Sequence, residues 1–457
     1  MSAGELRGAV PGRRVGVIGL ARSGRAAARL LRAEGASVYA SDTRDTPDLR
    51  ATAEALREGG VDVDLGHHDP GRLAECDWLV TSPGIPPGAP VFALPEVDGK
   101  PVYSEVEVAF WFAGAPVVAV TGTNGKTTTT ALLGEIARAA GFAVEVAGNI
   151  GRAFGEAVLD GGPVDWYVLE VSSFQLGRIE AFHPRVAVVL NLAPDHLDWY
   201  PRFEAYVADK ARIAENLGRG DDLVLNAEDA AVAGFGADRP ASRHWFHRSA
   251  PVERGATVEA GRIVLVGESD AGPVMAVDEL AIPGAHNLQN ALAATVAAAR
   301  MGVDRETIAG ALAAFPGVPH RLETVHEEAG VTWVNDSKAT NVGSAEVALE
   351  AFDRPLVVIL GGRHKGSPYA PLASELAERA RAVLAIGEAA PVIAAELAES
   401  VEVEEVGTLE RAVSRARALA RPGDVVLLSP ACSSYDQFTS YEERGERFRD
   451  LVTGGSR

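Results

Sequence analysis

The fold is decided by the stretch Val117-Val-Ala-Val-Thr-Gly-Thr-Asn-Gly-Lys-Thr-Thr128. Its apolar start predicts a strand, its two glycines bracket a turn, and Lys126 opens a segment with helical spacing. Gly122 and Gly125 permit a tight turn whose backbone amides, with the positive end of the next helix, attract anionic oxygens. Lys126 adds a full charge, and the Thr127 hydroxyl suits Mg²⁺. We expect a phosphate loop that binds ATP. Because the spacing Gly-x-x-Gly-Lys-Thr is two residues shorter than the general pattern, a plain glycine turn is the alternative.

Composition narrows the class of protein. A chain of 457 residues should hold two to four domains. Its 43 Lys and Arg against 63 Asp and Glu give a net charge of −20, which repels nucleic acid and acidic membranes, so we expect neither as a partner. The two cysteines, Cys76 and Cys432, lack metal-type spacing and fit a reducing compartment. No apolar run approaches the roughly 18 residues of a membrane span, and Arg13-Arg14 leads into a strand pattern rather than the apolar region of a signal peptide. We therefore expect a soluble cytoplasmic protein.

Strand-like apolar runs alternate with Ala/Leu/Arg-rich helical stretches, which predicts α/β architecture. Three domains are expected, over residues 1–104, 105–317 and 318–457. The second block carries short strand-like runs with glycine turns near 241–282. The third begins after Pro316-Gly-Val-Pro319 and returns to the α/β pattern.

The first block starts like a dinucleotide-binding unit. A strand over Arg14–Ile18 leads into the loop Gly19–Gly24, and Asp42 follows a second strand where a ribose-binding acid belongs. However, Ala21 replaces the middle glycine of the fingerprint, which weakens close approach of the backbone to a pyrophosphate. The pattern fits a nucleotide-type ligand and a plain βαβ unit equally well.

Polar residues follow the next two strands of the second block. Trp166–Leu169 leads to Glu170, and Val186–Leu190 leads to Asn191 and then to Asp195, His196 and Asp198. Because the carboxyl ends of parallel strands share one edge of a sheet, these groups should converge with the phosphate loop. We expect Glu170 to hold Mg²⁺ and His196 to be a second ligand. The alternative for His196 is a structural role.

Lys210 has an unusual place in the pattern. Over Phe203–Leu217 the residues Phe203, Tyr206, Ile213 and Leu217 recur at helical spacing, and Lys210 falls on the same face. Its ammonium either reaches water along the surface or is desolvated. A desolvated amine can add carbon dioxide and form an anionic carbamate, which would bind a second Mg²⁺.

The loops of the third block are rich in cations and hydroxyls. In an acidic protein, Arg321, Lys338 and Lys365 form a candidate site for a carboxylate-bearing substrate. Solvated loop lysines are the alternative. We expect Cys432 to be a small buried side chain.

Four motifs carry a family resemblance: Gly122–Thr128, Glu170-Val-Ser-Ser-Phe-Gln-Leu176, Asn335-Asp-Ser-Lys-Ala-Thr-Asn341 and Ser429-Pro-Ala-Cys-Ser-Ser-Tyr-Asp-Gln-Phe438. Over essentially its whole length the chain resembles the Mur ligases, and in particular their D-glutamate-adding branch. The resemblance implies a Rossmann-like UDP-sugar domain, a central P-loop ATPase-like domain with added β-strands, and a Rossmann-like amino-acid domain. It also implies an ATP-dependent ligation in which UDP-N-acetylmuramoyl-L-alanine and D-glutamate are joined through an acyl phosphate, in a chain that acts as a monomer.

The same resemblance implies roles for individual residues. ATP would be bound by Gly122, Thr123, Asn124, Gly125, Lys126, Thr127, Thr128, Asn287, Arg321 and Asp336. The UDP-sugar would be bound by Leu20, Ala21, Arg22, Asp42, Thr43, Ser82, Gly84, Asn149 and His196. D-glutamate would be bound by Lys338, Thr340, Lys365, Ser434 and Tyr441. Two Mg²⁺ ions would be held by Thr127, Glu170, His196 and carbamylated Lys210, and the catalytic residues would be Lys126, Lys210 and His196. Ala21 replaces a common glycine, and Tyr441 stands where relatives carry phenylalanine.

Other functions fit less well. Another Mur-type ligase or a folylpolyglutamate synthase is the nearest alternative, and the segment Asp42-Thr-Arg44 argues against the folate enzyme. A nicotinamide dehydrogenase leaves the phosphate loop unexplained. A non-catalytic nucleotide-sugar sensor would not need Lys126, Glu170, His196 and Lys210 together.

Overall fold

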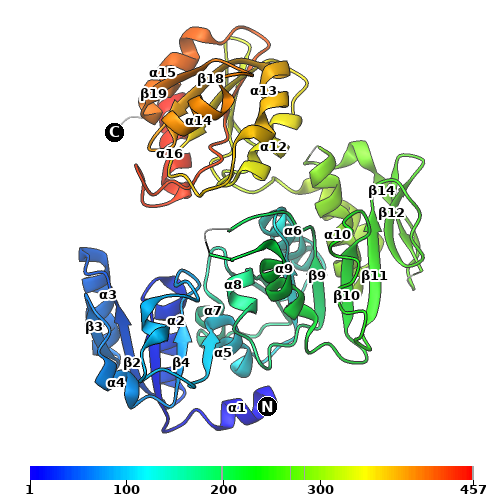
Figure 1. Cartoon of the computed structure of the whole chain (residues 1–457). Coiled ribbons are helices and arrows are strands. Elements are labelled where there is room, and N and C mark those ends of the chain that lie inside the picture. The colour runs from blue at the N-terminus through cyan, green and yellow to red at the C-terminus, as the bar shows by residue number, and fades with distance from the viewer. Residues whose placement is uncertain (197–198, 268, 283, 455–457) are drawn as a thin grey trace. The chain divides into compact units, whose positions relative to one another are not determined.

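The structure is a computed structural model of the chain, and it describes residues 1–196, 199–267, 269–282 and 284–454 (Figure 1). Asp198 therefore lies outside the described residues. The chain forms two compact units: residues 1–192, 199–280 and 288–315 make the first, and residues 193–198, 281–287 and 316–457 make the second. Each is built on parallel-rich sheets, which confirms the α/β prediction. Across the described residues, no helix combines the length and the apolar character needed to cross a membrane.

The first unit begins with a parallel five-stranded sheet of order β3-β2-β1-β4-β5. Its strands are β1 (Arg14–Ile18), β2 (Ser37–Asp42), β3 (Asp62–Leu65), β4 (Trp78–Thr81) and β5 (Val102–Ser104). The accompanying helices are α1 (Ala3–Gly8), α2 (Arg22–Ala33), α3 (Pro47–Glu58) and α4 (Pro70–Ala74), with a 3₁₀ turn η1 (Pro90–Ala93). The predicted strand over Arg14–Ile18 is confirmed.

A glycine in α2 lets this helix pack closely on the turn after β1. A Cβ added at Gly24 would lie 1.8 Å from the carbonyl oxygen of Gly19. No side chain can be accommodated at that distance, so the last glycine of the fingerprint serves helix–strand packing. Gly19 itself has a φ of +86° and turns the chain from β1 into the loop.

A nine-stranded sheet forms the rest of the first unit, in the order β14-β13-β12-β11-β10-β9-β6-β8-β7. Its strands are β6 (Val117–Thr121), β7 (Val144–Gly148), β8 (Trp166–Glu170), β9 (Val186–Val189), β10 (Asp222–Asn226), β11 (Ser242–His247), β12 (Gly255–Glu259), β13 (Arg262–Val266) and β14 (Gly272–Ala276). The helices are α5 (Glu105–Phe112), α6 (Lys126–Ala139), α7 (Phe154–Leu159), α8 (Ser173–Leu176), α9 (Phe203–Ala211), α10 (Ala285–Arg300) and α11 (Arg305–Ala314), with 3₁₀ turns η2 (Arg212–Ala214) and η3 (Val277–Glu279).

Strand β6 lies inside this sheet, between β8 and β9, and all five of its residues are buried. A continuous apolar run is what a strand covered on both faces requires. The strands β6 to β12 pair with their neighbours in parallel, whereas β13 pairs antiparallel with both β12 and β14. The glycine-rich runs near 241–282 form β11 to β14, as predicted. The predicted helix over Phe203–Leu217 is shorter, because α9 ends at Ala211 and tightens into η2.

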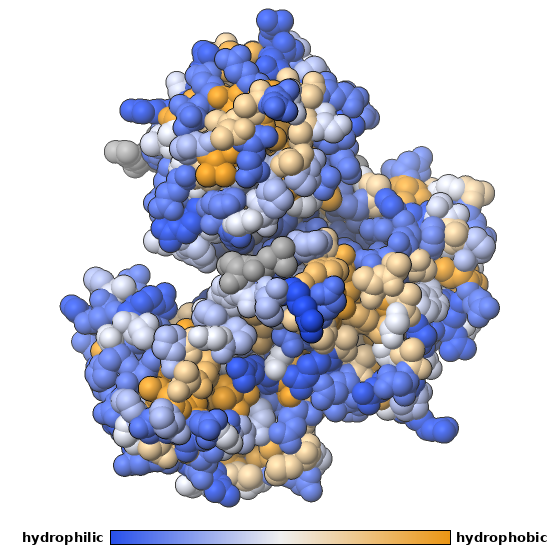
Figure 2. All heavy atoms as spheres, viewed as in Figure 1, coloured by the Kyte–Doolittle hydropathy of each residue, from blue (hydrophilic) through white to orange (hydrophobic). Residues whose placement is uncertain are grey.

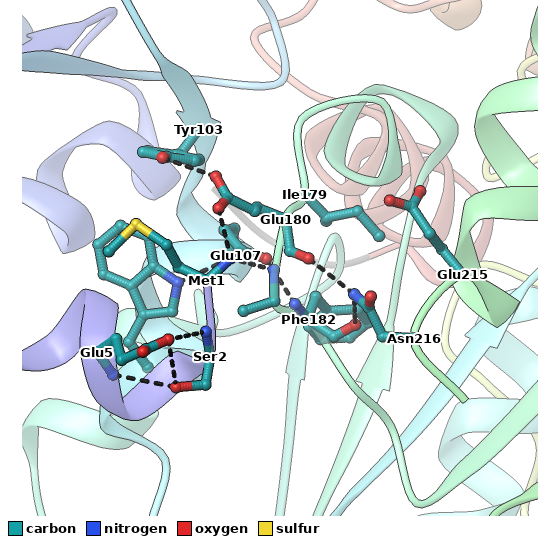
Figure 3. A network of polar contacts seen from close by, with 12 residues as sticks. Met1, Ser2, Glu5, Tyr103, Glu107, Ile179, Glu180, Phe182, Glu215 and Asn216 are labelled. Atoms are coloured by element: carbon teal, nitrogen blue, oxygen red, sulfur yellow. Dashed lines mark hydrogen bonds and ion pairs between the residues drawn. The ribbon is translucent and has the colours of Figure 1, made fainter. Parts of the chain in front are cut away.

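A polar network, buried at Glu107 and exposed at Met1, fastens the loop before β9 to α5 and to the N-terminal residue (Figure 3). Glu107 accepts hydrogen bonds from the amides of Ala181 (2.7 Å) and Phe182 (2.8 Å). Figure 3 shows Glu180 between the Tyr103 hydroxyl and the amino group of Met1, and both donate to its carboxylate. The bonds to Glu107 satisfy two backbone amides of this connecting segment.

Glu105, at the start of α5, is a fully buried carboxyl group. The amide of Gly155 donates to its Oε1, while Oε2 is buried with no hydrogen-bond partner. Burial raises the pKa of Glu105 to about 7, against the lowering influence of the Gly155 amide. The folded chain thus binds this proton more tightly than the unfolded chain does.

We expect Glu105→Gln to stabilise the protein at pH 8 and to leave its stability at pH 4.5 unchanged. The wild-type carboxyl ionises near pH 4.5 when unfolded and near pH 7 when folded, so its contribution is lost as pH rises between these values. The gap corresponds to about 3 kcal/mol. Urea unfolding at both pH values checks this, with exposed Glu54→Gln as the control. Equal effects of Glu105→Gln at both pH values would contradict it.

The second unit contains a six-stranded sheet of order β15-β16-β20-β17-β18-β19, in which only β15 is antiparallel to its neighbour. Its strands are β15 (Glu323–Glu328), β16 (Val331–Asn335), β17 (Leu356–Gly361), β18 (Ala380–Ile386), β19 (Val403–Gly407) and β20 (Val425–Leu428). Its helices are α12 (Val342–Glu350), α13 (Ala373–Arg379), α14 (Ala390–Leu397), α15 (Leu409–Leu419) and α16 (Tyr441–Thr453), with a 3₁₀ turn η4 (Ala370–Leu372).

Alternate residues of these strands feed two apolar cores. Val358 and Leu360 of β17 pack with residues of α12, α13 and α14, whereas Val357 and Ile359 pack with residues of α15 and α16. The helices thus cover both faces of a parallel sheet, as a doubly wound domain requires.

Figure 2 shows the hydropathy of one face of the molecule. On the face shown in Figure 2, hydrophilic residues predominate in each unit and the apolar residues form scattered patches. Both cysteines are buried free thiols, which confirms the interpretation of Cys432 as a small core residue.

Candidate active site

The loop between β6 and α6 has the backbone of an anion-binding turn. Gly125 caps α6 with a φ of +82°, and a Cβ there would lie 2.2 Å from Oδ1 of Asn290. The first intrahelical bond joins the Thr129 amide to the Gly125 carbonyl at 2.9 Å. The three amides before Thr129 therefore lie at the helix start, where they carry the partial positive charge of α6.

Asn191, directly beyond β9, clamps this loop. The Thr123 amide donates to its carbonyl oxygen (2.8 Å), and the Asn124 amide donates to its Oδ1 (2.8 Å). Its Nδ2 returns a bond to the Asn124 carbonyl at 3.1 Å. Tyr206 of α9 adds a hydroxyl contact with Thr123 Oγ1 at 3.0 Å. The loop is thus held in shape before any ligand arrives.

The Lys126 ammonium folds back over its own loop. Its Nζ donates to the carbonyl oxygens of Gly122 (3.0 Å) and Thr123 (2.8 Å). An anionic ligand above the loop would compete with these neutral acceptors for the ammonium, and a charged acceptor makes the stronger bond.

Glu170, at the end of β8, joins the helix start to a second loop. Thr127 Oγ1 donates to its Oε2 at 2.7 Å, and Asn149 Nδ2 donates to its Oε1 at 2.9 Å. The Asn149 amide also bonds the Glu170 carbonyl oxygen. Gly148 permits this approach, because a Cβ there would lie 2.3 Å from the same oxygen. The predicted convergence of Glu170 with the phosphate loop is confirmed at Thr127, and Asn149 joins them although no strand-end prediction included it.

This corner fits a hard cation. Glu170 is 2 % exposed, its two hydrogen bonds come from neutral groups, and no described residue forms an ion pair with it. A buried carboxylate without a charged partner is costly, and a Mg²⁺ ion beside Thr127 Oγ1 would supply the missing charge through oxygen ligands. Among the described residues, however, no three His, Cys, Asp or Glu side chains gather as a ready-made metal cage.

Lys210 lies beneath the phosphate loop and does not reach water. It is 1 % exposed, its Nζ donates to the Gly122 carbonyl at 2.8 Å, and Thr121 Oγ1 lies at 3.5 Å. The ammonium also sits 4.7 Å from the centre of the Tyr206 ring. The alternative of a surface lysine with a solvated ammonium is therefore wrong.

In the N-terminal sheet, Asp42 organises the loop after β1. The amide of Leu20 donates to its Oδ2 (2.9 Å), and Arg44 forms a two-pronged ion pair with it. Burial raises the pKa of Asp42, but the bonds from Arg44 and Leu20 outweigh it and the pKa is lowered. Thr43, beside Asp42, is exposed.

The other predicted UDP-sugar residues of this sheet lie around the same edge. Leu20 and Ser82 are buried, whereas Ala21, Arg22 and Gly84 are exposed. Arg22 reaches the carbonyl oxygen of Gly151, beyond Asn149, at 2.6 Å. This bond connects the loop after β1 with the loop that contacts Glu170.

In the second unit, Asp336 follows β16 and is fully buried. Ser429 Oγ donates to it at 2.9 Å, the Leu322 amide donates at 3.2 Å, and Arg321 lies 3.7 Å away. Burial raises the pKa of Asp336 to about 6 against the lowering influence of Arg321 and these bonds.

The residues predicted to bind D-glutamate follow neighbouring strands of this unit. Lys338 Nζ donates to the Tyr441 hydroxyl at 2.9 Å, and Ser434 is buried in the loop after β20. Lys365 and Thr340 are half-buried in the loops after β17 and β16. Their roles, like those of all the predicted site residues, stay predictions.

Two further predicted residues also belong to the second unit. His196 has a φ of +54° and lies 3.7 Å from the carboxylate of Asp195, which accepts a bond from Asn341 (3.2 Å). Asn287, which the resemblance assigns to ATP binding, is nearly buried in the first turn of α10.

Asn191 was expected to lie near the phosphate loop because it directly follows an apolar strand, and its contacts with Asn124 confirm this. Two residues were not predicted from the sequence: Tyr206 as a loop contact, and Arg444 of α16, which donates to Ser337 and to the Cys432 carbonyl. Arg444 lies four residues before the buried Phe448, so helical spacing alone places it on the inner face of α16.

Comparisons with known proteins match nearly the whole chain. Three family models match: "Mur ligase MurD-like, N-terminal domain" over residues 13–104, "Mur ligase middle domain" over 120–298 and "Mur ligase, glutamate ligase domain" over 320–432. A UDP-N-acetylmuramoylalanine--D-glutamate ligase of Salinibacter ruber is 47% identical, covering 96% of this chain and 97% of the relative. One from Anaeromyxobacter dehalogenans is 47% identical over 100% of both chains. A crystal structure of MurF from Acinetobacter baumannii has the same fold, with a TM-score of 0.61, 17% identity and coverage of 96% and 93%.

Proposed function

The chain belongs to the Mur ligase family, and from this premise we propose that it adds D-glutamate to UDP-N-acetylmuramoyl-L-alanine at the expense of ATP, a step of peptidoglycan precursor synthesis. The observation that carries the proposal is identity of 43% to 47% with relatives of that name over at least 95% of the chain. The phosphate loop, tied to Glu170, gives the proposal its chemical basis.

In the proposed reaction, the L-alanine carboxylate attacks the γ-phosphorus of ATP, and the bond to the β–γ bridging oxygen breaks. The products are an acyl phosphate and ADP. The amine of D-glutamate then attacks the acyl carbon, loses a proton, and expels inorganic phosphate as the amide forms. Two anions meet in the first step, so catalysis depends on positive charge placed around the transferred group.

The chain supplies that charge from the β6–α6 loop. The amides at the start of α6 would receive phosphate oxygens, and Lys126 would exchange its bonds to Gly122 and Thr123 for stronger ones to phosphate. The Asn191 clamp fixes the loop, so little reorganisation accompanies binding.

The corner of Thr127 and Glu170 is proposed to hold Mg²⁺, with His196 and a carbamate on Lys210 as the further ligands. When bound, the ion neutralises phosphate oxygens as charge shifts towards the leaving group. Lys210 has the burial that an uncharged amine requires before carbamylation, although its bond to Gly122 also suits an ammonium.

The substrate subsites are proposed mainly on the two Rossmann-like sheets. The loop after β1 with Asp42 would receive the uridine, Ser82 and Gly84 would lie near the diphosphate, and Asn149, after β7 of the nine-stranded sheet, would contact the UDP-sugar. Lys338, Thr340, Lys365, Ser434 and Tyr441 would receive D-glutamate, with the lysines paired to its carboxylates. We also propose a cytoplasmic monomer, since ATP is required and both cysteines are free thiols.

An amino-acid panel tests the proposal by ADP release. With ATP, Mg²⁺ and UDP-N-acetylmuramoyl-L-alanine present, we expect release with D-glutamate and at least about 10²-fold lower kcat/KM with L-glutamate, D-aspartate, L-lysine or diaminopimelate. L-lysine lacks the second carboxylate, whereas L-glutamate, D-aspartate and diaminopimelate carry two that differ from those of D-glutamate in configuration or spacing, so they cannot meet both lysines and present the amine in the same position. Preference for another amino acid, or ADP release without any, would reject the assignment.

A further inference from the structure

Arg444, on α16, is a fully buried cation of the second unit. It is 1 % exposed and lies three residues after Tyr441. Its Nε donates to Ser337 Oγ (2.9 Å), and its Nη2 donates to the carbonyl oxygens of Ser337 (2.8 Å) and Cys432 (3.2 Å). Burial lowers the pKa of Arg444 to about 10, so the guanidinium stays charged at neutral pH.

These bonds join two of the loops proposed to bind the amino acid. Ser337 directly precedes Lys338 in the loop after β16, and Cys432 lies two residues before Ser434 in the loop after β20. The same Ser337 hydroxyl donates to the Tyr441 carbonyl at 2.8 Å. One guanidinium therefore sets the spacing between Lys338, Ser434 and the start of α16.

A third loop makes room for the guanidinium. Gly362 follows β17, three residues before Lys365, and a Cβ there would lie 3.1 Å from Nη1 and 2.2 Å from the Ser433 carbonyl oxygen. The strands β16, β20 and β17 are neighbours in the sheet, so their carboxyl ends form one edge. Arg444 lies beneath all three loops of that edge.

A role in packing alone does not explain why a charged side chain is buried at position 444. Nη1 is buried, and no acceptor among the described residues lies within hydrogen-bond reach of it. A buried charge with an unfilled donor destabilises a fold, and apolar residues of similar volume commonly fill such space better. The nearby acids, Asp336 and Asp436, act on it at longer range without bonding to it.

We propose that Arg444 is a positioning residue for the amino-acid substrate. Its planar fork fixes the loops that carry Lys338 and Ser434, and its charge beneath them favours an amino acid with two carboxylates over one with a single carboxylate. This inference rests on the proposed function, and it adds a selectivity determinant that does not touch the substrate. A lysine at position 444 would keep the positive charge but lose the planar guanidinium that bonds to both loops.

Steady-state kinetics of Arg444→Lys, Arg444→Gln and Arg444→Met test the inference. We expect the KM for D-glutamate to rise about 10- to 100-fold in the neutral variants and less in Arg444→Lys, because charge-assisted bonds are lost. The KM values for ATP and the UDP-sugar should stay within about twofold. Arg447→Met is the matched control: Arg447 lies one turn further along α16 and pairs with Glu410 at 2.9 Å.

The ratio of kcat/KM for D-glutamate to that for D-glutamine separates positioning from stability. We expect this ratio to fall in the neutral variants, to recover in Arg444→Lys, and to stay at the wild-type value in Arg447→Met. A lower Tm with an unchanged ratio, or equal rises in all three KM values, would overturn the inference. If the wild type prefers another amino acid, the proposed function fails, and the same KM comparison with that amino acid still decides the role of Arg444.

Discussion

Replacing Glu170 with glutamine is expected to lower kcat for ADP release by about 10³-fold. Glutamine has nearly the same shape, so the hydrogen bond from Thr127 can persist at an amide oxygen. What disappears is the negative charge that Glu170 brings to Thr127 and Asn149. Without it the corner no longer has the ligand type that Mg²⁺ prefers.

Calorimetric titration with ATP, with and without Mg²⁺, gives a readout apart from turnover. The wild type should bind ATP more tightly when Mg²⁺ is present, and Glu170→Gln should lose most of that difference. Glu145→Gln, on the neighbouring strand β7, is the control, since Glu145 pairs with Arg152 away from this corner. Full retention of Mg²⁺-dependent binding in Glu170→Gln would contradict the proposed metal site.

Strand-end geometry predicted that Glu170 meets the phosphate loop, whereas Asn149 was expected at a substrate site only from the family resemblance. Glu170 follows the apolar residues of β8, the phosphate loop follows β6, and the parallel pairing of these two strands brings their ends together. Glycine spacing added the loop, because Gly122 and Gly125 need φ values that other residues avoid. Helical periodicity placed Lys210 on an inner face, and its burial bears this out.

The remaining features depend on side-chain partners that no spacing reveals. The sequence predicts that Asp42 faces a ligand. In the structure, Arg44 and the Leu20 amide donate hydrogen bonds to its carboxylate. That pairing depends on rotamers and on the path of the loop after β2. Arg444 is similar, because its fork meets Ser337 and Cys432, which are about a hundred residues apart along the chain. Such contacts arise only once the sheet order β16-β20-β17 is known.

Replacing Lys210 with alanine is expected to lower kcat for ADP release by about 10²-fold or more. Two physical reasons compete. As a carbamate, Lys210 would contribute a negative ligand for Mg²⁺. As an ammonium, it holds the phosphate loop through the Gly122 carbonyl at 2.8 Å and lies over the ring of Tyr206. Lys210→Met, which restores most of the lost volume, should be as inactive as alanine under either account.

Small molecules that enter the space left by Lys210→Ala distinguish the two accounts. We expect acetate or propionate to restore activity at least about fivefold, because a carboxylate replaces the carbamate head, and added bicarbonate to restore none. Ethylammonium at the same ionic strength is the matched control and should have no effect. Rescue by ethylammonium instead would assign Lys210 the role of a cationic tether for Gly122, and the second metal ligand would then have to come from another residue.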